Sequence, residues 1–81
     1  MTETINAIRN SKQTFKDYVE TYTVLEERKK RLTVDSKRAR GLEALRIERR
    51  ISTIEDELYE IDLNLVAISR YINALQQRDL G

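Results

Sequence analysis

The stretch "IERRISTIEDELYEIDLNLVAISRYINAL", residues 47 to 75, carries an uninterrupted repeat of apolar residues. Successive apolar positions are separated by four and then three residues, over nine consecutive members. This heptad spacing is typical of an α-helix that packs one narrow face against another helix. It predicts a long helix from about residue 42 to about residue 78. The seam consists of Ile47, Ile51, Ile54, Leu58, Ile61, Leu65, Ile68, Ile72 and Leu75.

This predicted helix is more apolar than one seam requires. Outside the repeat, Tyr59, Val66 and Tyr71 widen the apolar surface of the same segment. A helix that is apolar on more than one side must be covered by more than one neighbour. We therefore expect the nine seam residues to form the core of an oligomer, and these three side chains to form a face for a partner.

The first half of the chain shows a similar but less regular pattern. Ile8, Phe15 and Tyr22 recur every seven residues, and Tyr18, Leu25 and Leu32 form a companion row. The pattern predicts a helix from about residue 3 to about residue 32. Since proline is absent and glycine occurs only at Gly41 and Gly81, little else interrupts the two helices.

The segment "TVDSKRARG", residues 33 to 41, is predicted to be the connecting bend. Asp35 and Ser36 are favoured helix N-caps, and Gly41 suits a left-handed position at a helix end. Two alternatives stay open, because the second helix either starts at Ser36 and contains Gly41 or starts at Leu42. A third helix starting at the capping-box sequence "STIE", residues 52 to 55, is disfavoured because the seam passes through it without a change of phase.

Charge gives a check on how the two helices face each other. If the chain folds back near residue 37, residue i lies beside roughly residue 74 minus i. That register places Lys12 and Lys16 near the acidic run of residues 55–62, and Glu26 and Glu27 near the basic residues 46–50. Opposite charges would then meet along the hairpin.

Together these patterns predict one all-α domain over residues 1–81, an antiparallel two-helix hairpin with its bend at 33–41. An 81-residue chain buries a small core, and without cysteine or histidine it has neither disulfides nor Cys/His zinc sites. A partner chain is the remaining source of stability. We expect a homodimer of hairpins that forms a four-helix bundle.

Several functional classes are disfavoured by the sequence. There is no glycine-rich phosphate loop, no nucleophile elbow, and no cysteine or histidine for catalysis. We therefore expect no enzymatic activity, no cofactor, no metal and no small-molecule substrate. No apolar run approaches the roughly 20 residues of a membrane span, and no signal-peptide pattern opens the chain, so we expect a cytoplasmic protein.

Positive charge is concentrated in residues 28–50, which hold ten basic and three acidic side chains although the whole chain has a net charge of +1. Such a block attracts either phosphate backbones or an acidic protein surface. No helix-turn-helix, zinc-finger or RNP motif is present, so base-specific recognition is not expected. The residues expected to make such contacts are Lys37, Arg38, Arg40, Arg46, Arg49 and Arg50.

Two functional hypotheses follow from the sequence. The first is a small non-enzymatic adaptor, a dimeric helical hairpin that binds or regulates another protein through its free surface. The alternative is a module that binds nucleic acid without sequence preference through the basic block 28–50. In a third interpretation the basic side chains only keep the bend in solution and pair with nearby glutamates.

Overall fold

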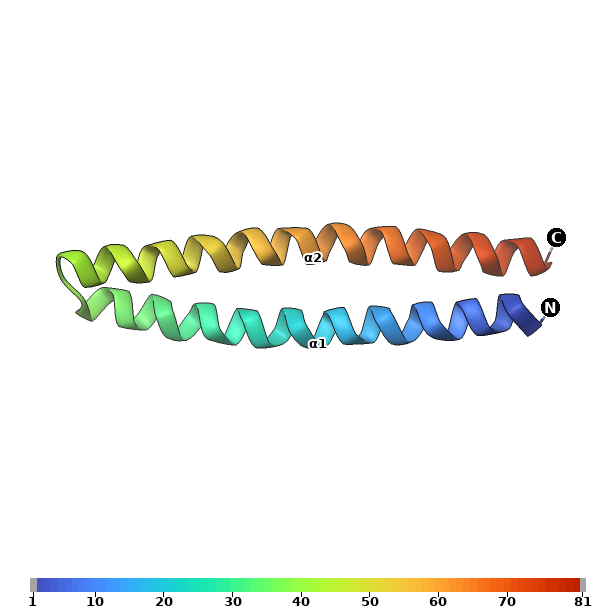
Figure 1. Ribbon diagram of the computed structural model, residues 1–81, viewed down its shortest axis with the longest axis horizontal. Coiled ribbons are helices and arrows are strands. Elements are labelled where there is room, and N and C mark those ends of the chain that lie inside the picture. Colours follow the sequence, from blue (N-terminus) through green and yellow to red (C-terminus); the bar gives the residue numbers. More distant parts are fainter. Residues whose placement is uncertain (1, 81) are drawn as a thin grey trace.

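The computed structural model describes residues 2–80 as two helices, α1 (Thr2–Arg38) and α2 (Leu42–Leu80). The helices run antiparallel and form a thin rod of 60 × 15 × 13 Å, with the bend at one end and both chain ends at the other (Figure 1). The predicted all-α hairpin is confirmed. Neither helix contains, within the described residues, an apolar stretch long enough to cross a membrane.

The two heptad patterns face each other along the rod. Leu25 of α1 is buried against Ile54, Leu58 and Ile61 of α2, and these four residues form the core. The other predicted seam residues of α2 are half-buried on the same face. The core is completed by partly buried apolar side chains from both helices, namely Tyr18, Tyr22, Leu32 and Leu65.

The connection between the helices is shorter than the sequence predicted. Residues 33–38 belong to α1, and only residues 39–41 lie between the helices. The Thr33 hydroxyl donates a hydrogen bond to the Lys29 carbonyl at 2.8 Å, and the Ser36 hydroxyl donates one to the Thr33 carbonyl at 2.7 Å. Both hydroxyls thus bond back to the preceding turn, as they do inside helices, and do not cap a new one.

Gly41 makes the turn. Its φ is +64°, a left-handed conformation that only glycine adopts without a steric cost, and its carbonyl accepts the Leu45 N–H at 3.3 Å. The second helix therefore begins at Leu42, which decides between the two open alternatives. It continues through residues 52–55, where the Thr53 hydroxyl donates to the Arg49 carbonyl at 3.0 Å, so no third helix starts there.

The facing register also differs from the expected one. Lys29 Nζ lies 4.0 Å from Glu55 Oε1, and the charge of Asp62 acts on Tyr22. Both pairs of numbers add to 84, so residue i faces roughly residue 84 minus i, not 74 minus i. Lys12 consequently borders a hollow with Ser69, Ile72 and Asn73 and not with the acidic run. The longer α1 causes this shift, because it moves the fold-back point toward Gly41.

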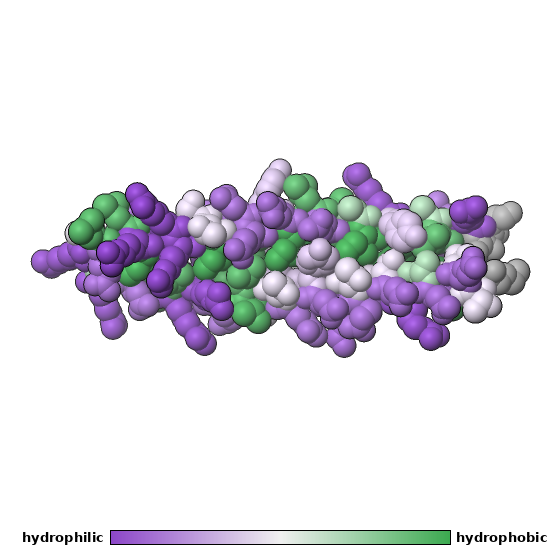
Figure 2. All heavy atoms as spheres, in the orientation of Figure 1, coloured by the Kyte–Doolittle hydropathy of each residue, from purple (hydrophilic) through white to green (hydrophobic). Residues whose placement is uncertain are grey.

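A two-helix rod leaves much apolar surface in water. The solvent-accessible area is 6776 Å², whereas the size scaling of compact monomers gives roughly 5,100 Å² for a chain of this mass. Figure 2 shows hydrophobic residues at the surface along the length of the rod, between borders of hydrophilic residues. The excess of about 1,700 Å² is comparable to the area of a standard protein–protein interface.

Replacing Gly41 with alanine should destabilise the hairpin by about 1–2 kcal/mol, the cost of a left-handed conformation for a residue with a Cβ. Apart from Gly41 and its two chain neighbours, no atom of the described residues lies within 4 Å of the place that the new Cβ would take, so the loss comes from the backbone conformation. Urea unfolding followed by circular dichroism measures it. Gly41→Asn is the matched control and should lose less, since asparagine tolerates this region better. Equal stability of Gly41→Ala and the parent chain would contradict the assignment.

Candidate interaction surfaces

The nine residues predicted for an oligomer core lie on the side of α2 that packs against α1. Ile54, Leu58 and Ile61 are buried within one chain, and the other six are half-buried. Because α1 already covers this seam, a second copy of the chain must approach another side of the rod. Whether the chain forms oligomers is therefore a question about its outer surfaces.

One such surface is a row of three exposed apolar side chains on the outer side of α2. Tyr59, Leu63 and Val66 are 65%, 53% and 49% exposed and are spaced by four and three residues, so they share one helix face. We call these three residues the outer stripe. Tyr71 is also exposed, but it lies about 140° around the helix from Val66 and does not join the stripe.

Tyr71 was predicted to belong to the partner face of α2, whereas Leu63 was not. The available signal was the spacing of 59, 63 and 66, which repeats the seam pattern on the opposite side of the helix. It was obscured because Tyr59, Val66 and Tyr71 were interpreted as one broad face. The structure separates α2 into an inner side, which α1 covers, and an outer side.

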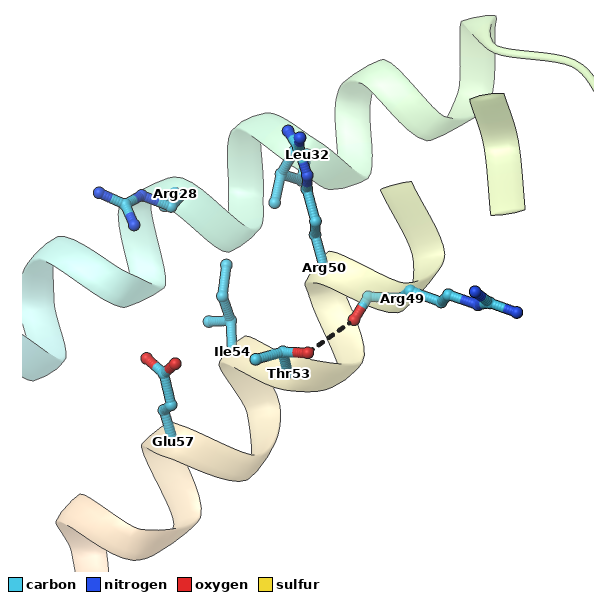
Figure 3. A pocket seen from close by; sticks show the side chains of 7 residues that line it. All are labelled: Arg28, Leu32, Arg49, Arg50, Thr53, Ile54 and Glu57. Carbon is cyan, nitrogen blue, oxygen red and sulfur yellow. Dashed lines mark hydrogen bonds between the residues drawn. The ribbon is translucent and has the colours of Figure 1, made fainter. Parts of the chain in front are cut away.

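A second surface is a groove in the bend half of the rod, between the two helices. Its first hollow has a volume of about 550 Å³, with Leu32 of α1 and Ile54 of α2 as an apolar floor (Figure 3). Arg28 and Arg50 stand on opposite helices beside this floor, while Arg49 extends away from α1 (Figure 3). The remaining lining residues are Thr53 and Glu57.

The groove continues toward the bend. A second hollow, of about 380 Å³, shares Leu32 and Arg50 with the first and adds apolar contacts from Ile47 and Ala39. Its polar lining comes from Asp35, Arg38 and Glu43. We call the two hollows together the bend groove. It combines an apolar floor with walls of both charges, four arginines against the carboxylates of Asp35, Glu43 and Glu57.

The structure divides the six basic residues predicted to contact a partner. Arg38, Arg49 and Arg50 line the bend groove, whereas Lys37, Arg40 and Arg46 lie outside it. All six are exposed. The sequence did not identify the floor residues Leu32 and Ile54 as part of a site, because each follows a heptad pattern and is indistinguishable from an ordinary core residue until the helices are placed together.

Charge also acts between the helices on the other side of the rod. Lys29 occupies a seam position of α1 and makes, within the described residues, the one ion pair of the chain, with Glu55. The side chains are 39% and 55% exposed, so this pair contributes little to stability. Nearby, the carboxylate of Asp62 raises the pKa of Tyr22, with partial desolvation and Glu26 acting in the same direction.

Comparisons with protein-family models, with curated proteins and with solved structures gave no significant match to this chain. In the part of the chain that the structure describes, no three acidic side chains come together in a way that could hold a metal ion.

The raised pKa of Tyr22 gives a direct test of the register. A raised pKa favours the neutral phenol in the folded chain, so its contribution to stability is complete below pH 10 or so and is lost as the pH rises through the raised value. Asp62→Asn should lower the pH at which Tyr22 ionises, as followed by NMR of its ring carbons. Glu26→Gln should lower it less, and Asp56→Asn should leave it unchanged. A response to Asp56 in place of Asp62 would contradict the register.

Proposed function

We propose that this chain is a non-enzymatic interaction protein that binds a helical segment of another protein in the bend groove. The observation that supports this most is the composition of the groove, an apolar floor of Leu32, Ile47 and Ile54 between walls that carry both charges. An amphipathic helix offers the matching surface, with an apolar stripe flanked by charged side chains. The bound helix would become a third helix beside α1 and α2.

The dimensions of the groove suit such a ligand. Its α1 lining runs from Arg28 to Ala39, which corresponds to roughly 17 Å or three helical turns. Three turns hold apolar residues at i, i+3 or i+4, and i+7, the spacing by which helices are recognised in grooves. Leu32 and Ile47 are only half-buried in the free hairpin, so a third helix would remove more of their surface from water.

The charges of the groove favour a protein over nucleic acid as ligand. Asp35, Glu43 and Glu57 border the same hollows as the arginines and would repel a phosphate backbone. A helix with both basic and acidic side chains pairs with both kinds of wall residue. Exposed charge pairs add little affinity, but they select the orientation and the partner.

Nucleic-acid binding stays the second candidate because of the tip of the bend. Lys37, Arg38 and Arg40 are exposed and make no ion pair within 4.0 Å among the described residues. The tip is the narrow end of the rod, so these cations can approach a phosphate backbone without the groove. Binding there would be electrostatic and would not read bases.

The groove hypothesis is tested by two substitutions that change charge equally. Arg50 lines the groove and Arg46 does not, although both are exposed arginines on α2 one turn apart. In affinity capture from the host followed by quantitative mass spectrometry, Arg50→Glu should lose a bound protein that Arg46→Glu retains. With that protein purified, calorimetry should show a loss of about tenfold or more in affinity for Arg50→Glu.

A neutral substitution completes this test. Thr53→Trp would fill the first hollow without changing charge, and Thr53 is exposed enough to accept the ring. It should abolish binding of the partner helix while circular dichroism shows the same helix content. Retained binding in Thr53→Trp, or equal losses in Arg46→Glu and Arg50→Glu, would contradict the groove hypothesis.

The second candidate predicts a different response to the same substitutions. Affinity for duplex or single-stranded DNA and RNA should fall linearly with the logarithm of salt concentration, as measured by fluorescence anisotropy. Charge reversal at Arg38, Arg40, Arg46 or Arg49 should weaken it by similar amounts, and Thr53→Trp should not. Absence of binding at low salt would remove this candidate.

A further inference from the structure

The outer stripe lies on the opposite side of α2 from the floor of the bend groove, since Leu63 and Ile54 are about 180° apart around the helix. It therefore needs a ligand of its own. We propose that two copies of this chain associate through the outer stripe of α2, antiparallel, about a twofold axis between Leu63 and Val66. This dimer is independent of what the bend groove binds.

The stripe is well placed for a symmetric contact. Tyr59, Leu63 and Val66 lie close to the middle of α2, which runs from residue 42 to residue 80. A twofold axis near the middle of two equal rods lets them overlap along most of their length. In such a contact each copy contributes the same patch, so the stripe must be complementary to itself.

The residues around the stripe meet this condition. The hairpin itself shows that in an antiparallel pair the numbers of facing residues add to a constant. With the axis between Leu63 and Val66 that constant is 129, so Leu63 lies on Val66 of the second copy, and the reverse contact occurs by symmetry. One layer further out, Tyr59 faces Arg70, and beyond it Asp56 faces Asn73.

Arg70 joins these layers. From the second copy its guanidinium reaches both the face of the Tyr59 ring and the carboxylate of Asp56, and each contact occurs twice in the dimer. A guanidinium is attracted to both groups, to the aromatic ring through a cation–π contact and to the carboxylate through a charged hydrogen bond. At the margins of the contact, where the sum of the facing numbers departs from 129 by two, Glu60 lies nearest Ala67 and Asp62 nearest Ser69, so neither carboxylate meets a like charge.

Charge also determines the polarity of the dimer. In a parallel contact through the same face, each residue would lie against its own copy, so that Asp56 met Asp56 and Arg70 met Arg70. The two basic blocks of residues 28–50, with ten basic and three acidic side chains each, would lie side by side. The antiparallel arrangement places these blocks at opposite ends and avoids both repulsions.

The elongated shape of the rod, and not the stripe alone, leaves surface for such a contact. The rod exposes about 1,700 Å² more surface than a compact monomer of its mass. A standard interface buries 1,600 Å² or so over both partners. The dimer leaves the floors of both bend grooves open, roughly 45 Å apart along the rod, and two such sites on one particle would bind a repeated partner with avidity.

Sedimentation equilibrium of the full chain tests the contact. The parent chain should be dimeric at micromolar concentration, and Leu63→Asp should be monomeric with unchanged helix content by circular dichroism. The matched control is Val24→Asp, since Val24 is 57% exposed on α1 and away from the stripe, and it should stay dimeric. A monomeric parent chain, or a dimer that Leu63→Asp leaves intact, overturns the proposal.

A charge swap tests the register. Asp56→Arg and Arg70→Asp should each weaken the dimer about tenfold or more, and the double variant should restore its affinity. Within one helix these residues are 14 positions and about 21 Å apart, so restoration can only report a contact between two copies. Independent, additive losses in the double variant overturn the register.

Spin labels test the polarity. The chain has no cysteine of its own, so Arg38→Cys carries a single label near the bend. In the antiparallel dimer the two labels should be about 55 Å apart, calculated from the rise per residue and the axis position. A distance of roughly 20 Å or less would mean a parallel dimer and would overturn the proposal.

Discussion

The contact between the two heptad seams holds the structure together, and every other feature depends on its register. Among the residues whose burial the structure describes, only four are buried, and all four lie in this seam near the middle of the rod. Toward the ends the α1 seam carries Ser11 and Ser36, which are half-buried and contribute little apolar surface. Lys29, at a seam position of α1, approaches Glu55 across the hairpin. Polar residues at such positions weaken a helix pair but favour one register over others.

That register determines what the charged block can do. In the sequence, residues 28–50 contain ten basic and three acidic side chains. In the hairpin, Arg28 borders the same hollow as Glu57, and Lys29 meets Glu55, although both glutamates lie outside the block in the sequence. Part of the positive charge is therefore balanced by α2. What distinguishes the bend half is the apolar floor between its charges more than the charge itself.

The accuracy of the sequence prediction follows from how each segment is stabilised. The seam of α2 consists of isoleucine and leucine throughout, so hydrophobic spacing alone predicts its helix. The end of α1 was misplaced because its seam continues through Leu32, Ser36 and Ala39, with spacings of four and three residues but with polar or small members. A pattern of large apolar residues ends at Leu32, whereas the helix does not. Lys37 and Arg38 are good helix formers, and the half-buried Ile47 of α2 lies beside the last turn of α1, so the helix continues past Leu32.

The surfaces were harder to predict than the fold, because a surface depends on how the two helices are placed together. The residue number determines where a side chain lies around the helix axis. Which side of the helix is buried is determined only by the position of the second helix. Leu63 and Ile54 are both apolar members of one helix, and α1 alone makes Ile54 a floor residue and Leu63 an exposed one. In a rod 13–15 Å thick every side chain is also close to water, so a ligand is recognised along the length of the helices and not in an enclosed interior. Elongated ligands, a helix in the groove or a second rod on the stripe, are the ones that such a shape can contact over a large area.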